Sequence, residues 1–310
     1  MVRSSDWGMA GLLLLLAWWV PLPLYLVALS CFALPHVIWE MMWIRRAVAG
    51  QLPGWWWSLL GVVLAVQASF RLAAASGAMG GGAAWAADLL TLGAAVVLVL
   101  AVPGLRGGRL GWLAGLLALA GAVLLTWVGV AGRPEATVTI LVALSVTHNI
   151  VPIGLERLGM SNNEPWGSLR WMFLLPLILL VAPALPEPPF AARLPAWEPG
   201  ELAWLQARMP SGLSNLFSAL VLAQCLHYLA ILRILPRRLE HGWVQDRWRG
   251  PALVAASAMT LGFIWSFPEA RRLYGVVAGV HAWIEWPILL CLLGGALGRQ
   301  LGASDGISNG

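Results

Sequence analysis

The sequence predicts an all-α protein, a polytopic transmembrane helical bundle of about nine to ten helices. Two observations predict this fold class. Of the 310 residues, 60% are hydrophobic and 11% are charged, whereas soluble domains carry about 25% charged residues. Apolar runs of the length that crosses a bilayer, about 20 residues, recur along nearly the whole chain, and most have no polar face. We therefore expect a single integral membrane domain over residues 1–301, followed by a disordered tail at 302–310.

The apolar runs define the expected helices one by one. The stretch Gly8–Val20 is a further, short or tilted candidate, because at about 1.5 Å per residue it does not reach the roughly 30 Å of the hydrocarbon core. The Pro-rich segment from Ala182 to Ser211 is expected to be an external loop. The nine main spans are Leu24–Val48, Trp56–Ala75, Ala84–Pro103, Leu110–Ala131, Ala136–Leu155, Leu169–Val181, Gly212–Leu235, Ala252–Ser266 and Val276–Leu297.

Tryptophan and arginine mark the expected membrane boundaries. Many of the 20 Trp residues lie near the ends of apolar runs, where amphipathic rings favour the interface. If the Leu24–Val48 helix ends in the cytoplasm, alternation places twelve arginines on the inner side and six on the outer side. This bias predicts a multi-pass protein of the cell (inner) membrane. The net charge of +5 then encodes orientation, so we expect the lipid bilayer as partner and no nucleic acid.

Four histidines lie inside expected spans, where polar side chains are costly and usually face a cavity or the bundle interior. They fall at similar depths on four different helices, whereas His241 lies in an Arg-rich connection and is expected to be solvated. A single buried histidine is most often a hydrogen-bonded packing residue, but four at one depth predict a shared metal site. The four expected ligands are His36, His148, His227 and His281.

Two of these histidines are followed one helical turn later by a carboxylate: Glu40 follows His36 and Glu285 follows His281. Side chains four residues apart lie on one face of a helix, so each pair offers a nitrogen and an oxygen donor to one point. A carboxylate beside a metal-binding imidazole also orients the ring through its second nitrogen. The side chains expected as additional ligands or outer-layer partners are Glu40, Glu285, Asn149 and Tyr228.

Other interpretations of the same histidines stay open. Transmembrane histidine pairs hold b-type haem in electron carriers, although two stacked haems would place histidines at two depths. A small-solute or ion transporter would carry a polar site at mid-depth, but the chain shows no two-half symmetry. Unrelated interhelical hydrogen bonds or a proton path are further alternatives. A membrane hydroxylase or desaturase would carry clusters such as HxxxH, which the sequence lacks.

Residues 34–40, with the sequence LPHVIWE, resemble the first motif of the Brp/Blh family of bacterial and archaeal β-carotene dioxygenases. In that family, Pro-His is followed by Gly, and an acid stands four residues after the His. Here Val37 replaces the Gly and Glu40 stands for the usual Asp. The resemblance is motif-level near His36 and topological over most of the chain. Some members carry a closely spaced His pair late in the chain, and we take Glu285 after His281 to stand in its place.

The resemblance implies an enzyme that cleaves a carotenoid within the membrane, with β-carotene giving retinal. It implies a non-haem Fe²⁺ ion held by the four histidines. Haem b is the alternative cofactor, which the electron-carrier interpretation would need. Iron with open coordination positions can bind and activate O₂, and a site in the membrane core admits an apolar substrate directly from lipid. Four tryptophans near the expected ligands either line a channel for such a substrate or follow from the Trp-rich composition: Trp39, Trp43, Trp283 and Trp286.

Overall fold

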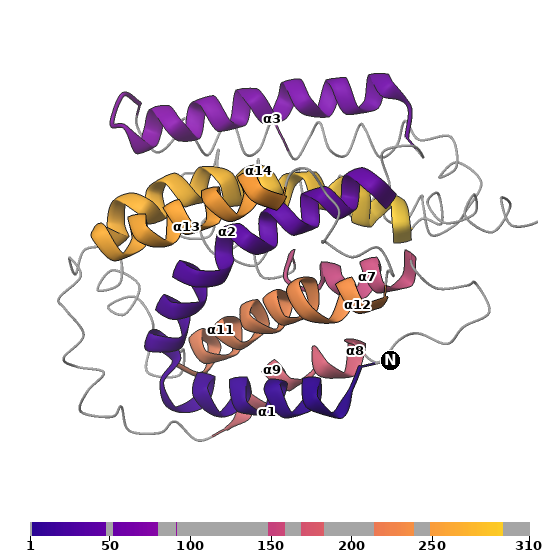
Figure 1. Cartoon of the computed structure of the whole chain (residues 1–310), viewed down its shortest axis with the longest axis vertical. Helices are drawn as coiled ribbons and strands as arrows, with labels where there is room; N and C mark the ends of the chain where they lie inside the picture. The colour runs from indigo at the N-terminus through magenta and orange to yellow at the C-terminus, as the bar shows by residue number, and fades with distance from the viewer. Residues whose placement is uncertain are drawn as a thin grey trace, which may run out of the picture. The chain divides into compact units, whose positions relative to one another are not determined.

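The computed structural model describes residues 2–47, 52–79, 91, 148–158, 169–182, 214–238 and 249–293. Every regular element in these ranges is helical, as the sequence predicts (Figure 1). Within these described ranges, three helices are long and apolar enough to cross a membrane: Pro21–Arg45, Gly54–Ala74 and Asn215–Arg237. Outside the described residues lie the expected span Leu110–Ala131, all of Ala84–Pro103 except residue 91, residues 136–147 of the expected span Ala136–Leu155, most of the 182–211 connection, His241 and the tail. The total of nine to ten spans therefore stays a prediction.

The chain divides into two compact units, each built from two separate stretches of sequence. Unit 1 contains Met1–Trp39 and Pro165–Arg271, and unit 2 contains Glu40–Glu164 and Arg272–Gly310. Two long helices, α2 (Pro21–Ala47) and α14 (Phe267–Leu293), each begin in unit 1 and continue into unit 2. The expected single membrane domain stays a prediction.

Unit 1 packs helices from separate parts of the chain against one another. In this unit α1, α9 and α11 contact one another (Figure 1), and the Thr260 hydroxyl of α13 donates to the Ser30 carbonyl of α2 at 2.9 Å. The Gly8–Val20 stretch of the sequence forms most of α1. Besides the first parts of α2 and α14, the helices that the structure describes in unit 1 are α1 (Ser4–Trp19), α8 (Leu169–Met172), α9 (Leu175–Val181), α11 (Ser214–Leu229), the π-helix η4 (Ala230–Ile234), α12 (Leu235–Arg238) and α13 (Arg249–Trp265).

Prolines interrupt two of the expected continuous helices. The segment Leu169–Val181 breaks into α8 and α9, because Pro176 has no N–H to donate to the carbonyl one turn before it. In unit 2, a turn at residues 149–150 follows His148, and α7 (Val151–Leu158) begins after it. Pro152, the second residue of α7, likewise cannot donate to the His148 carbonyl. His148 therefore directly precedes a break within the expected span Ala136–Leu155.

Helix α14 begins at Phe267, well before the expected start at Val276, so the prediction of a connection over residues 267–275 is wrong. The Ser266 carbonyl accepts a hydrogen bond from the Ala270 amide at 3.0 Å, which closes the first turn. Serine followed by proline at the second helical position and Glu269 at the third is a known helix start. Among the described residues of unit 2, the remaining helix is α3 (Gly54–Ala75), which follows the end of α2 in the chain.

Large apolar side chains are exposed along whole faces of the long helices. On α3 these include Trp55, Val62 and Leu72, and on α13 they include Val254 and Trp265. Apolar faces of this extent are rare on water-soluble monomers. They fit helices whose outer surface contacts lipid.

Candidate metal centre

Unit 2 gathers two histidines and two carboxylates from three separate segments. Helix α14 supplies His281 and Glu285, which are one turn apart and therefore share a face. The last part of α2 supplies Glu40, and the segment before α7 supplies His148. The Glu40, His281 and Glu285 side chains are at most 2% exposed, and the His148 side chain is 11% exposed.

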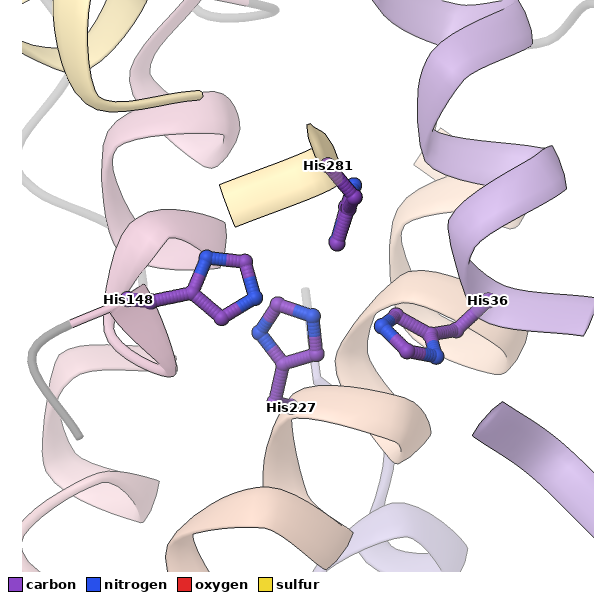
Figure 2. Close-up of side chains that lie close together, drawn as sticks. All are labelled: His36, His148, His227 and His281. Atoms are coloured by element: carbon purple, nitrogen blue, oxygen red, sulfur yellow. The ribbon is translucent and has the colours of Figure 1, made fainter. Parts of the chain in front are cut away.

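Glu285 contacts both imidazoles of this cluster. Its Oε2 lies 2.7 Å from His148 Nδ1, and its Oε1 lies 2.9 Å from His281 Nε2. The carboxylate of Glu40 approaches the same His281 nitrogen at 3.5 Å. The two rings stand edge to face, with centroids 4.9 Å apart (Figure 2). One ligand atom from each of Glu40, His281 and Glu285 lies within 4.8 Å of the other two.

This donor set suits a divalent metal ion. Imidazole nitrogens combined with carboxylate oxygens bind iron and zinc. Two buried carboxylates that share one imidazole are costly unless a proton or a cation joins them. The carboxylate of Glu285 lies within ion-pair distance of His148 Nδ1 and His281 Nε2, so it helps to fix where these two rings lie. A carboxylate that fixes the orientation of metal-binding histidines is a recurrent arrangement in proteins.

Unit 1 holds a second pair of buried imidazoles, those of His36 on α2 and His227 on α11. Their rings also stand edge to face, with centroids 5.1 Å apart (Figure 2). His36 Nδ1 lies 3.2 Å from the Phe32 carbonyl. Because a carbonyl can only accept, Nδ1 carries the proton, and Nε2 of the neutral ring is the nitrogen with metal-donor character.

Tyr228 supports the His36 ring. The two rings have centroids 4.3 Å apart, and the Tyr228 hydroxyl accepts a hydrogen bond from Gln224 Nε2 at 2.6 Å. Gln224 is one turn before Tyr228 on α11, so the same helix face carries both. The π-helix η4 begins at Ala230, directly after this segment, and π-helical turns are frequent at functional sites.

The structure thus pairs the four sequence-predicted histidines within the units, His36 with His227 and His148 with His281. That both pairs serve one ion stays a prediction. Glu40 and Glu285 contact His281, and Tyr228 contacts His36, but their roles as additional ligands or outer-layer partners stay predictions. Asn149 lies in the turn after His148, and its role as an outer-layer partner stays a prediction.

The sequence did not reveal two contacts of the helices that carry the histidines. The Phe32 carbonyl is a backbone acceptor, and no side-chain motif marks it. Arg71 of α3 donates to the Gly275 carbonyl of α14 at 3.5 Å, and its guanidinium lies over Gly279. Two glycines four residues apart in an apolar helix are a signal for close packing, and Arg71 is the side chain that lies over the second of them.

Comparisons with known proteins give no family for this chain: no family model, no curated protein and no solved structure matches it.

Proposed function

We propose that this chain is a membrane-embedded, metal-dependent oxygenase, in which non-haem iron acts on a long apolar substrate such as a carotenoid. The buried cluster of Glu40, His148, His281 and Glu285 is the observation that carries the proposal. Charged and ionisable groups inside a membrane are rare and usually functional. Two histidines and a carboxylate are also the donors that non-haem Fe²⁺ oxygenases use, with coordination positions left open.

The proposed ligands are the four histidines, and the carboxylates hold them in place. Iron at this site would supply the binding and activation of O₂. Glu285 would keep one proton on each of His148 and His281 and so direct their second nitrogens inward. The Phe32 carbonyl would do the same for His36. Glu40, at 3.5 Å from His281, would complete the charge balance or add an oxygen ligand.

The apolar substrate is proposed from the surroundings of the cluster. Helix α2 carries both His36 and Glu40 and is one of the three helices with the length and hydropathy of a membrane span. A substrate that is dissolved in the bilayer would reach such a helix without first entering water, where exposing its apolar surface is unfavourable. The resemblance of residues 34–40 to the first motif of the β-carotene dioxygenases makes β-carotene the first substrate to test.

A haem-based electron carrier is the alternative, and the contacts of Glu285 argue against it. A haem iron would need the nitrogens of two histidines on opposite faces of a porphyrin. His148 and His281 instead share one carboxylate, at 2.7 and 2.9 Å. A carboxylate between the rings has no role in that type of site.

Retinal formation in bacteria that already make β-carotene tests the proposal. We expect retinal in extracts of cells that express the parent chain, and none in cells that express His281→Ala, because His281 contacts both carboxylates of the cluster. The matched control is His241→Ala, which makes the same chemical change in the Arg-rich connection and should leave retinal formation intact.

Three results would count against parts of the proposal. If the well-expressed parent gives no retinal, β-carotene is not the substrate, and other apolar substrates must be tested with the purified protein. If His281→Ala produces as much retinal as the parent, the buried cluster is not the reaction site. A haem absorption band in the purified parent would support the electron carrier.

A further inference from the structure

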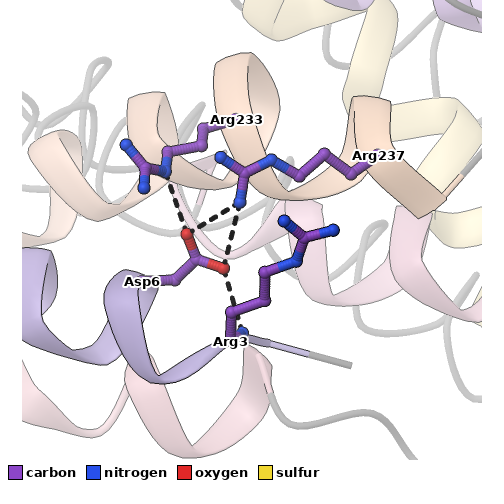
Figure 3. Close-up of polar contacts among 4 residues, drawn as sticks. All are labelled: Arg3, Asp6, Arg233 and Arg237. Atoms are coloured by element: carbon purple, nitrogen blue, oxygen red, sulfur yellow. Dashed lines mark hydrogen bonds and ion pairs between the residues drawn. The ribbon is translucent and has the colours of Figure 1, made fainter.

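Besides the carboxylates of the metal centre, a buried carboxylate lies at the start of α1, and no expected metal ligand is near it in the sequence. Asp6 is 1% exposed and accepts hydrogen bonds from three residues of unit 1 (Figure 3). Its Oδ2 accepts from the Arg3 backbone amide at 3.0 Å, and its Oδ1 accepts from Arg233 Nε at 2.9 Å and from Arg237 Nη1 at 3.1 Å. The sequence analysis did not single out Asp6.

The arginines of this cluster have more donor capacity than Asp6 uses. A guanidinium carries five N–H donors. Arg233 bonds to Asp6 only through Nε, and Arg237 only through Nη1, while Arg3 contributes its backbone amide and not its side chain. The Arg233 and Arg237 side chains are 34% and 35% exposed, so their outer nitrogens can reach a ligand. Three arginines against one aspartate leave a net charge of about +2.

The cluster lies where an apolar helix ends. Arg237 is the last residue of the candidate span Asn215–Arg237, and Arg233 is one turn inside it. Trp7, next to Asp6, is a partly exposed tryptophan, and Trp171 of the same unit is exposed and carries the Arg170 guanidinium over its ring at 4.8 Å. Tryptophan and arginine together are typical of the headgroup level of a bilayer.

We propose that Arg3, Arg233 and Arg237 form a binding site for the phosphate of an anionic lipid headgroup, with Asp6 holding the two helix-borne guanidiniums in place. Guanidinium groups bind phosphate oxygens through paired hydrogen bonds. Basic side chains at the membrane surface attract anionic lipids. The site depends on the chain lying in a membrane but not on the metal or the reaction.

Thermal unfolding of the full chain in lipid nanodiscs tests this site. The unfolding temperature is compared in nanodiscs of phosphatidylcholine alone and in nanodiscs that contain phosphatidylglycerol, and the difference is the lipid response. We expect the parent to unfold at a higher temperature when phosphatidylglycerol is present. Inorganic phosphate added to the phosphatidylcholine nanodiscs should not reproduce this increase, which separates a lipid headgroup from a free anion.

Arg3→Gln is the most informative variant, because the Arg3 backbone amide still bonds to Asp6 and only the side-chain charge is lost. It should fold like the parent and lose most of the lipid response. Arg45→Gln is the matched control, since it removes one exposed arginine that the charge bias places on the same side of the membrane. It should keep the response. Asp6→Asn, which removes the internal counter-charge, should unfold earlier in phosphatidylcholine but show a larger lipid response than the parent.

The proposal fails if the parent shows no lipid response, or if Arg3→Gln and Arg45→Gln reduce the response equally, which would indicate general surface charge. An equal increase with inorganic phosphate would indicate an anion site without lipid and would also overturn the proposal. Retinal formation and metal content are measured separately, so failure here leaves the proposed function standing.

Discussion

At the scale of single residues, Glu285 is the side chain on which the candidate metal centre depends most. It contacts both His148 and His281, whereas Glu40 contacts His281 at a longer distance. A carboxylate that orients two ligands fixes two coordination bonds at once. Its loss should therefore affect metal binding more than the loss of Glu40.

We predict that Glu285→Gln weakens metal binding by about ten- to hundredfold, the range found when partners of metal-bound histidines are replaced. Glu40→Gln should weaken it less. Competition of the purified protein with a chelator of known affinity measures both values. Equal affinities for Glu285→Gln and the parent would show that Glu285 does not orient the ligands.

The carboxylate of Asp6 gives a second residue-scale prediction, on pH dependence. Burial alone would raise the pKa of the Asp6 carboxyl, but the hydrogen bonds from Arg3 and Arg233 and the charges of Arg237 and Arg233 outweigh it and lower this pKa. A carboxyl group whose pKa is lower in the folded protein stabilises the fold fully above its ordinary pKa of about 3.9. That stabilisation is lost as the pH falls through the folded-state pKa.

Asp6→Asn should therefore lower the free energy of unfolding at neutral pH by about 1.5–3 kcal/mol, the usual contribution of hydrogen bonds to charged groups. The difference between parent and variant should shrink once the pH falls below about 4. Unfolding temperatures of both proteins in detergent, measured from neutral to acidic pH, check this. A difference that stays constant down to the lowest pH would show that Asp6 is not ionised in the folded chain.

At the scale of helices, the sequence predicted the positions of α2, α3, α11 and α13 closely, because hydropathy alone marks long apolar segments. It did not predict the break at Pro176, since hydropathy does not depend on whether a backbone N–H is present. It placed the start of α14 too late, because the charged residues Glu269, Arg271 and Arg272 suggested a connection.

The candidate site shows the same division between what the sequence reveals and what it does not. The i, i+4 spacing identified Glu40 and Glu285, because helix geometry is local. That Glu285 reaches His148 as well as His281 depends on how separate segments pack, and spacing contains no information on this. The same reason explains why the contact of Asp6 with Arg233 and Arg237 went unpredicted.

The packing of α3 on α14 yields an element-scale prediction. A Cβ atom at Gly279 would lie 2.8 Å from Arg71 Nε and 2.9 Å from Arg71 Cζ, so Gly279→Ala should displace the Arg71 side chain from the Gly275 carbonyl. A Cβ at Gly275 meets no atom within 4 Å, which makes Gly275→Ala the matched control. Both variants gain helix propensity equally.

We expect Gly279→Ala to be less stable than Gly275→Ala by about 1 kcal/mol, the usual net contribution of one hydrogen bond. Unfolding temperatures in the same detergent give the comparison. If Gly279→Ala is as stable as Gly275→Ala, the contact between Arg71 and α14 does not stabilise the fold.

At the scale of the whole molecule, orientation in the membrane is the property that charge predicts. The arginine bias places the N-terminus and the connection after α12 on the inner side. Within unit 1, Asp6 of α1 bonds to Arg233 and to Arg237 of α12, so these two ends lie at the same level. This contact agrees with a span by α1 that is antiparallel to the segment from α11 to α12.

Reporter fusions test this orientation. A fluorescent protein fused at the N-terminus or after Arg238 should fluoresce, as it does in the cytoplasm. Alkaline phosphatase inserted between Ala182 and Ser214 should be active, because that enzyme needs the oxidising environment outside the cytoplasm. The reverse pattern would show that the charge bias does not set the orientation of this chain.

Metal analysis of the purified protein tests the central claim most directly. The parent chain, purified in detergent from cells grown with iron, should carry about one iron ion per molecule, His281→Ala should carry almost none, and His241→Ala should match the parent. Absence of any bound metal from a folded parent, or equal metal in the parent and in His281→Ala, would contradict the assignment of the buried histidines and carboxylates as a metal centre.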